Sequence, residues 1–359
     1  MAKSKRIFYY DALRAMAIIG IVFCHAAASF AAKCSNSPDF YVAAFLDCFR
    51  DFSIPIFVML SGALLIMRRD SLRDFFKKRL SRIFIPFIFW VIVYIVYTAL
   101  TLDHAFIPAK AIDIFFGTAN TMGVTFWFIW MIVIVYLLIF IINKVAEFGC
   151  ERTGGFDRKF ILALTILSVI YIALCDFDFI NPMRSKIPYF ASFITYIIIG
   201  YFIANSDYLE SRIGTKKMIA ATFLFSVGLY FYYIFYYVVP KSLLTNHFTY
   251  MHYFHLLILA MSVSIFLLFK YVSKTDFSRN IEENRLGSFI TLISKYSFGI
   301  YLCHYVILHK LRRDLVVYYA HQSPIVWIPV LVVLTLAISL AILFVLNRIP
   351  ILNRFTGKA

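Results

Sequence analysis

The sequence predicts an all-α, polytopic transmembrane helix bundle. Of its 359 residues, 62% are hydrophobic and 15% are charged, whereas a soluble domain is roughly half apolar and a quarter charged. Apolar runs of about 20 residues recur along the chain, and each is long enough to cross a hydrocarbon core of roughly 30 Å. These runs lack the polar alternation of β-barrel strands. The bilayer is therefore the expected solvent.

Ten apolar runs are predicted to span the membrane. No loop between them has room for a soluble domain, so residues 1–359 are expected to form one transmembrane domain. The longest external loop, 103–123, contains Pro108, Gly117 and Gly123 and is a candidate lid or re-entrant piece. In chain order, the predicted spans are 11–32, 43–67, 83–102, 124–142, 160–175, 188–205, 218–239, 252–272, 289–309 and 325–346.

The distribution of Lys and Arg predicts the orientation, because these residues accumulate in cytoplasmic loops. With the N-terminus inside, the inside segments hold 24 of them and the outside loops hold 8. Both termini are therefore expected in the cytoplasm, with the chain in the cell (plasma) membrane. The net charge of +16 is then mostly explained by topology and contact with membrane lipids. No nucleic-acid partner is expected.

Arg14 and His25 are an arginine and a histidine inside the first predicted span. Such side chains are costly at membrane depth and usually face the bundle interior. The two are eleven residues apart, so they share one helix face and lie about 16 Å apart along its axis. Arg14 is expected roughly 5 Å and His25 roughly 21 Å above the inner boundary.

Asp47 and Asp51 lie in the second predicted span, at heights of roughly 24 and 18 Å, and so bracket His25. A carboxylate on one ring nitrogen makes a neutral imidazole a competent general base. In the alternative interpretation, both aspartates neutralise Arg50 between them. The sequence leaves both open. It also leaves His304, inside a later span, divided between packing and function.

No metal site is expected. The six cysteines show neither a disulfide framework nor a CxxC pattern. His252 and His255 are spaced like a metal pair, but they are expected at the outer membrane interface beside tyrosines, where amphipathic side chains are enriched.

Four stretches occur in a characteristic order: YDALRAMAIIGIVFCHA, with Arg14 and His25 as R-x10-H; PIFVMLSGALLI, with Ser61-Gly62; FFKKRLSRIFIPFIFW; and SFGIYLCHYVIL. Together with the ten spans, they resemble the acyltransferase family 3 membrane proteins, and within these the surface polysaccharide O-acetyltransferases. One departure concerns the fourth span. That branch often reads H-L-W-F-L there, whereas this chain has TFWFI from Thr125 to Ile129, so a role for that histidine does not transfer.

The resemblance implies an O-acyltransferase that moves an acyl group, expected to be acetyl, from cytoplasmic acyl-coenzyme A to a hydroxyl of a surface or lipid-linked glycan. Acyl-coenzyme A is a co-substrate, and no permanently bound cofactor is expected. His25 would be the general base or an acyl carrier, oriented by Asp47 or Asp51. A transporter or flippase without covalent chemistry is the rival class.

The donor's phosphates are expected to bind a set of cations at the cytoplasmic face. The Lys and Arg residues of the stretch FFKKRLSRIFIPFIFW have an alternative explanation, because any cytoplasmic loop could carry them for membrane topology and for attraction to anionic lipid. The expected phosphate-binding residues are Arg14, Lys77, Lys78, Arg79 and Arg82.

Overall fold

The computed structural model describes residues 6–31, 38–68, 71–103, 108–118, 122–153, 158–176, 186–245, 255–319 and 323–358. These residues are almost entirely helical and include no strand, which confirms the predicted all-α class. The α-helices are α1 (Phe8–Ala31), α2 (Pro38–Asp47), α3 (Phe49–Leu65), α4 (Leu72–Thr98), α5 (Pro108–Phe116), α6 (Trp127–Thr153), α7 (Arg158–Asp176), α8 (Lys186–Asn205), α9 (Tyr208–Ile213), α10 (Thr215–Tyr232), α11 (Val239–Thr245), α12 (Leu256–Val272), α13 (Asp276–Glu283), α14 (Arg285–Tyr319) and α15 (Pro324–Arg348).

Seven helical segments in the described ranges are long and apolar enough to cross a membrane. The pair α12 and α13, bent by 81°, makes an eighth if it counts as one span. Two shorter apolar helices, Leu162–Cys175 and Phe193–Asn205, fall on the remaining predicted runs. The chain is thus a polytopic helical membrane protein. The count of ten spans and the cytoplasmic placement of both termini stay predictions.

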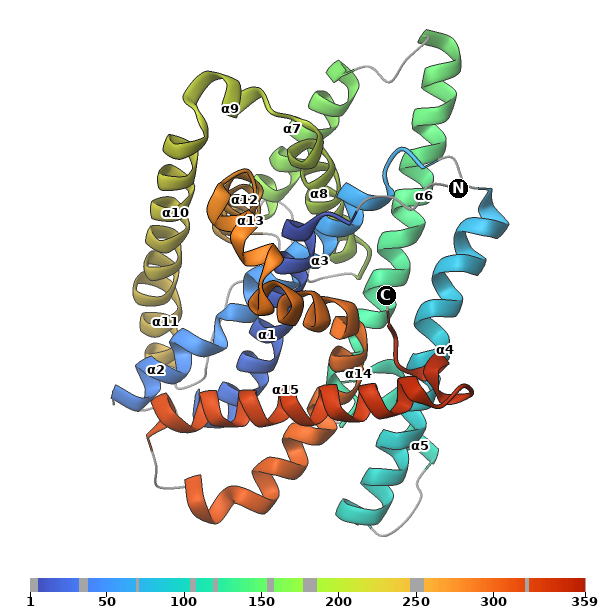
Figure 1. Ribbon diagram of the computed structural model, residues 1–359, viewed down its shortest axis with the longest axis vertical. Helices are drawn as coiled ribbons and strands as arrows, with labels where there is room; N and C mark the ends of the chain where they lie inside the picture. The colour runs from blue at the N-terminus through green and yellow to red at the C-terminus, as the bar shows by residue number, and fades with distance from the viewer. Residues whose placement is uncertain are drawn as a thin grey trace.

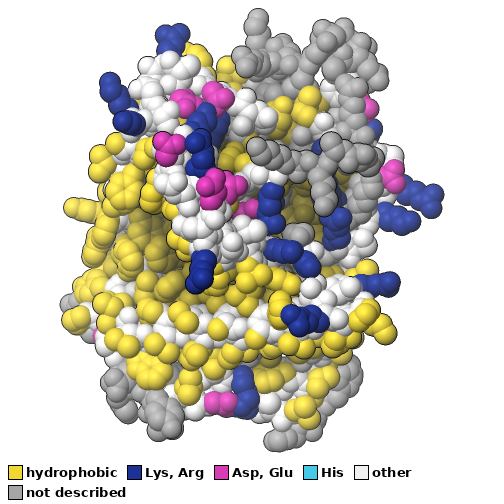
Figure 2. Space-filling model, in the orientation of Figure 1, with side chains coloured by type: hydrophobic (Ala, Val, Ile, Leu, Met, Phe, Trp, Pro, Cys, Tyr) yellow, Lys and Arg dark blue, Asp and Glu magenta, His cyan; other side chains and the backbone are white. Residues whose placement is uncertain are grey.

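Lipid-facing surfaces are visible on single helices. On α4, Ile85, Ile88, Ile92 and Val96 are exposed and recur every three or four residues, so they form one apolar stripe. Figure 2 shows hydrophobic side chains over much of one face, including a band across its lower half, with most Lys and Arg above this band. An apolar surface of this extent is typical of a protein embedded in lipid.

Helix α1 passes through the middle of the molecule (Figure 1) and packs against α2, α3, α14 and α15. The last of these, drawn in red, lies across the front of the bundle. Arg14 and His25 therefore lie on a helix that is surrounded by other helices. Their side chains face protein neighbours, as the cost of charge in lipid predicts.

Helices α3 and α8 cross closely at two glycines. A Cβ atom at Gly62 would lie 2.0 Å from the carbonyl oxygen of Ile197, and one at Gly200 would lie 2.2 Å from that of Met59. Only glycine permits backbones to approach so closely, which is a common device between membrane helices. The crossing fixes the end of α3 that carries Ser61.

Several helix boundaries differ from the sequence-based prediction, and two of the differences concern the second span and the external segment 103–123. The second predicted span is helical from Pro38 and is interrupted at Cys48, between α2 and α3. The external segment 103–123 contains a helix of its own, α5, which packs against α4, and Trp130 donates to the carbonyl oxygen of Phe115 over 3.2 Å. Hydropathy marks the apolar stretch and not the helix ends, so neither feature was visible in the sequence.

The chain after α15 folds back onto the bundle. The rings of Phe355 and Phe89 stack at 4.6 Å, and the indole nitrogen of Trp90 donates to the carbonyl oxygen of Phe355 over 3.3 Å. This packing brings Gly357 and Lys358 beside α14.

A buried lysine closes the junction of α8, α9 and α12. Lys270 is 5% exposed, and its ammonium donates over 2.7 Å to the carbonyl oxygens of both Ile203 and Ser206. Hydrogen bonds from Lys270 and Lys274 hold the pKa of Asp207 below its usual value. These contacts satisfy carbonyl groups at the C-terminal end of α8.

Candidate active site

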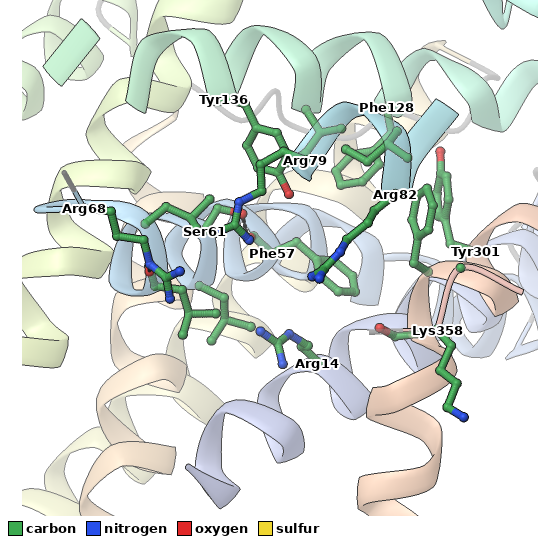
Figure 3. A pocket seen from close by; sticks show the side chains of 18 residues that line it. Arg14, Phe57, Ser61, Arg68, Arg79, Arg82, Phe128, Tyr136, Tyr301 and Lys358 are labelled. Atoms are coloured by element: carbon green, nitrogen blue, oxygen red, sulfur yellow. Dashed lines mark hydrogen bonds between the residues drawn. The ribbon is translucent and has the colours of Figure 1, made fainter. Parts of the chain in front are cut away.

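A cavity of about 290 Å³ opens between α1, α3, α4, α6 and α14. Arg14 of α1, Arg68 after α3, and Arg79 and Arg82 of α4 line it; we call it the arginine cavity. Figure 3 shows the guanidinium groups of Arg14, Arg79 and Arg82 turned toward one common space, with Arg68 at its edge. The described lining includes no Asp or Glu. An anion would relieve the repulsion among these groups.

Arg14 is held in place by Asp11, which lies three residues earlier on α1. Its guanidinium lies 3.6 Å from the carboxylate of Asp11, which is 2% exposed. Arg6 also pairs with this carboxylate, and the hydroxyl of Ser294 donates to it over 2.7 Å. A single carboxylate thus anchors α1 to α14 and leaves the arginine cavity with excess positive charge.

The first turns of α4 determine which basic side chains reach the cavity. The helix begins at an N-cap, where Ser71 accepts a hydrogen bond from the backbone amide of Asp74. Arg79 and Arg82 are three residues apart and share a face. Lys77 is exposed and outside the described lining. The side chain of Lys78 lies outside the described residues.

Lys358 also lines the cavity, but with its backbone. Its ammonium turns away (Figure 3) and donates to the side-chain oxygen of Asn347 over 3.1 Å. Gly357, the preceding residue, has a φ of +60°, a conformation that favours glycine. The C-terminal segment therefore closes one wall without adding a charge.

The inner wall of the cavity is aromatic. The rings of Phe57 and Phe128 lie 6.2 Å apart, and those of Phe128 and Tyr301 lie 5.1 Å apart. The hydroxyl of Tyr301 donates to the carbonyl oxygen of Thr125, which fixes its ring at the inner end. On the same helix, the ring of His304 lies 5.9 Å from that of Tyr301. The cavity therefore ends beside a buried histidine.

Two histidines from different helices meet beyond this wall. The ring centroids of His25 on α1 and His304 on α14 are 5.3 Å apart, with an angle of 38° between their planes. Tyr305 packs its ring edge-on to His25 at 5.2 Å. His304 is completely buried, whereas His25 is only partly buried. We call His25 and His304 the histidine pair.

Asp47 and Asp51 face Arg50. Both carboxylates lie 3.5 Å from its guanidinium, and they are 2% and 0% exposed. The hydroxyl of Tyr233 donates to Asp51 over 2.6 Å. Within the described residues, no hydrogen bond or ion pair joins either carboxylate to His25. These contacts are the ones expected if both aspartates neutralise Arg50; a catalytic role for Asp47 or Asp51 stays a prediction.

Arg312 lies between the predicted spans 289–309 and 325–346, in a segment expected to be an external loop. Helix α14 continues to Tyr319, well beyond the predicted end at 309. As a result Arg312 is helical and donates to the carbonyl oxygens of His25 and Ala26. It was missed because the apolar run that marks the span ends before it. It adds positive charge directly beside the histidine pair.

Together the fold and the site define a polytopic membrane protein with an arginine-lined cavity whose inner wall lies beside the histidine pair. A family model described as an acyltransferase domain matches residues 7–344. The chain therefore belongs to acyltransferase family 3 and is a membrane acyltransferase. No curated protein and no solved structure matches it.

Proposed function

We propose that this acyltransferase moves an acetyl group from cytoplasmic acetyl-coenzyme A to a hydroxyl of a cell-surface carbohydrate, and that it does so in the plasma membrane. One observation carries the proposal. The arginine cavity collects four guanidinium groups at one end, and its other end, at Tyr301, lies against the histidine pair. A donor with phosphates at one end and a thioester at the other fits this polarity.

The arginines would hold the phosphates of the donor. Guanidinium groups form short, charge-assisted and often bidentate hydrogen bonds with phosphate. The apolar wall formed by Phe57, Leu60 and Phe128 suits the uncharged pantetheine arm. Arg14 and His25 share α1, so the arm would follow this helix for about 16 Å.

His25 is the proposed general base. It takes the proton of the acceptor hydroxyl while the hydroxyl oxygen bonds to the thioester carbon. When the tetrahedral intermediate collapses, the carbon–sulfur bond breaks and the thiolate receives the proton from His25. An acyl-histidine intermediate is the alternative covalent route and uses the same residue. Asp47 and Asp51 neutralise Arg50 and take no direct part.

The acceptor side of the proposal rests on the resemblance to surface polysaccharide O-acetyltransferases. The acceptor would approach His25 from outside, opposite the arginine cavity. Family membership favours this enzyme over a flippase. A flippase would leave the glycan chemically unchanged, so the two differ in product.

Mass spectrometry of surface glycans tests the proposal. Cells that make the wild-type protein should carry glycans with an added acetyl mass, and cells with His25→Ala should not. His309→Ala is a matched control, since His309 lies on α14 and binds the hydroxyl of Tyr97 over 3.0 Å. It should acetylate normally. Unchanged glycans in wild-type cells, or normal acetylation with His25→Ala, would contradict the proposal.

A further inference from the structure

The two ring nitrogens of His304 have different surroundings. Its Nδ1 lies 2.7 Å from the carbonyl oxygen of Tyr301 and 3.1 Å from that of Ile300. Carbonyl oxygens only accept hydrogen bonds, so Nδ1 carries the proton. In a neutral imidazole the other nitrogen, Nε2, then presents a lone pair. The backbone of α14 thus fixes the tautomer of His304.

That lone pair has no hydrogen-bond partner in the described part of the protein, although Nε2 is fully buried. A buried acceptor without a partner is costly and rare, and it calls for an explanation. A purely structural histidine at this position needs only Nδ1. The unused nitrogen indicates a partner that forms its hydrogen bond at another stage.

His25 is the group placed to supply that partner. Its ring centroid lies 5.3 Å from that of His304. Two imidazoles joined by an N–H···N bond have centroids about 5 Å apart, given a nitrogen separation of about 3 Å. Catalytic hydrogen bonds are often incomplete without substrate and tighten when it binds. A small rotation of the partly exposed His25 ring would complete this one.

We propose that His304 is the positioning residue of this acyltransferase, and that its Nε2 accepts an N–H hydrogen bond from His25. The proposal rests on the function proposed above. In many hydrolases a carboxylate orients the catalytic histidine and fixes which of its nitrogens is basic. In this proposal His304 does the same for His25. Asp47 and Asp51, the candidates for that role in the sequence, are instead engaged by Arg50.

This bond would determine which nitrogen of His25 is basic. With one nitrogen donating to His304, the other presents its lone pair to the acceptor hydroxyl. The hydroxyl proton passes to this nitrogen as the new carbon–oxygen bond forms. It then passes to the sulfur as the carbon–sulfur bond breaks. His304 gains and loses no proton and stabilises the imidazolium between the two events.

Paired amide substitutions separate this role from a structural one. His304→Asn keeps an N–H near the position of Nδ1, able to reach the Ile300 and Tyr301 carbonyl oxygens, but lacks an acceptor at Nε2. His304→Gln places a carbonyl oxygen near Nε2. Purified variants would be compared for acetyl transfer from labelled acetyl-coenzyme A and for thermal midpoint in detergent, with His309→Asn as the matched control.

The expected result is that His304→Asn folds, lowers kcat by at least about 100-fold and leaves KM for acetyl-coenzyme A unchanged. His304→Gln should retain activity within about tenfold of wild type, and His309→Asn should be fully active. A folded His304→Asn variant with wild-type kcat would overturn the inference. If that variant does not fold, His304→Gln decides, and a loss beyond about 100-fold in the folded protein would overturn it. Absence of transfer by the wild type would instead contradict the proposed function.

Discussion

Arg14 and His25 share one helix but have different neighbours. Arg14 faces the arginine cavity and lies 3.6 Å from Asp11, whereas the His25 ring packs against the rings of His304 and Tyr305. In the proposed function, the spacing of eleven residues joins the end that binds the donor phosphates to the end that transfers the proton. In this account the first determines how tightly the donor binds, and the second determines how fast it reacts.

Arg79→Ala and Arg82→Ala should each raise KM for acetyl-coenzyme A by about 10- to 100-fold, because a charge-assisted hydrogen bond contributes roughly 1.5–3 kcal/mol. The rate at saturating donor should change little, since these arginines bind the part of the donor that does not react. The concentration dependence of transfer in detergent measures both quantities.

Lys77→Ala is the matched control for these variants. Lys77 belongs to the same basic stretch of α4 but is exposed and outside the cavity lining. Its KM should stay within about twofold of wild type, because a surface charge contributes little. An equal rise in KM for Lys77→Ala would mean that the stretch attracts the donor by net charge and that the cavity is not the binding site.

Part of the candidate site could be predicted from the sequence, residue by residue. Burial cost singled out Arg14 and His25, and the basic stretch contained Arg79 and Arg82. The partner of His25 was not predictable, because His304 is distant in sequence and only helix packing brings α14 beside α1. Height along the helix axis favoured Asp47 and Asp51. It could not show that they face Arg50, since height does not define direction.

Among the helices, the crossing of α3 and α8 leaves no room for a larger residue at its glycines. Gly62 and Gly200 each face the backbone of the other helix. A backbone cannot move aside as a side chain can, so a methyl group here would separate the helices. Ser61, whose hydroxyl donates to the carbonyl oxygen of Phe57 over 3.0 Å, would move away from the arginine cavity with α3.

Gly62→Ala should lower the thermal midpoint of the purified protein, because overpacking a tight contact costs about 1–3 kcal/mol or more. Gly228→Ala is the control: this glycine lies within α10, and a Cβ there would meet nothing within 4 Å. That change should be neutral or slightly stabilising, since alanine favours a helix by about 1 kcal/mol. Equal midpoints for the two variants would show that the close crossing is absent in solution.

Helix identity followed from the sequence more closely than helix ends did. Within the described residues the predicted apolar runs are almost entirely helical, because the cost of exposing peptide groups to lipid forces such runs to be helical. The interruption at Cys48 and the continuation of α14 to Tyr319 depend on packing and polar contacts outside the apolar stretch. Hydropathy carries no information about either.

In the whole molecule, the arginine cavity and the histidine pair would face opposite sides of the membrane. The arginine cavity would receive the donor at the cytoplasmic face, and the histidine pair would meet an acceptor that arrives from outside. The excess of Lys and Arg in alternate loops predicts this orientation. The proposed direction of transfer would therefore follow from the orientation of the fold and not from any single residue.

Sealed membrane vesicles of defined orientation test whether acetyl groups pass from the cytoplasmic face to a glycan on the other side. Labelled acetyl-coenzyme A would be added outside vesicles that enclose the surface glycan and whose cytoplasmic face points outward. The account predicts that label appears on the enclosed glycan, and that vesicles of the opposite orientation, given external donor, transfer none. Equal transfer in both orientations, or no labelled glycan in either, would contradict it.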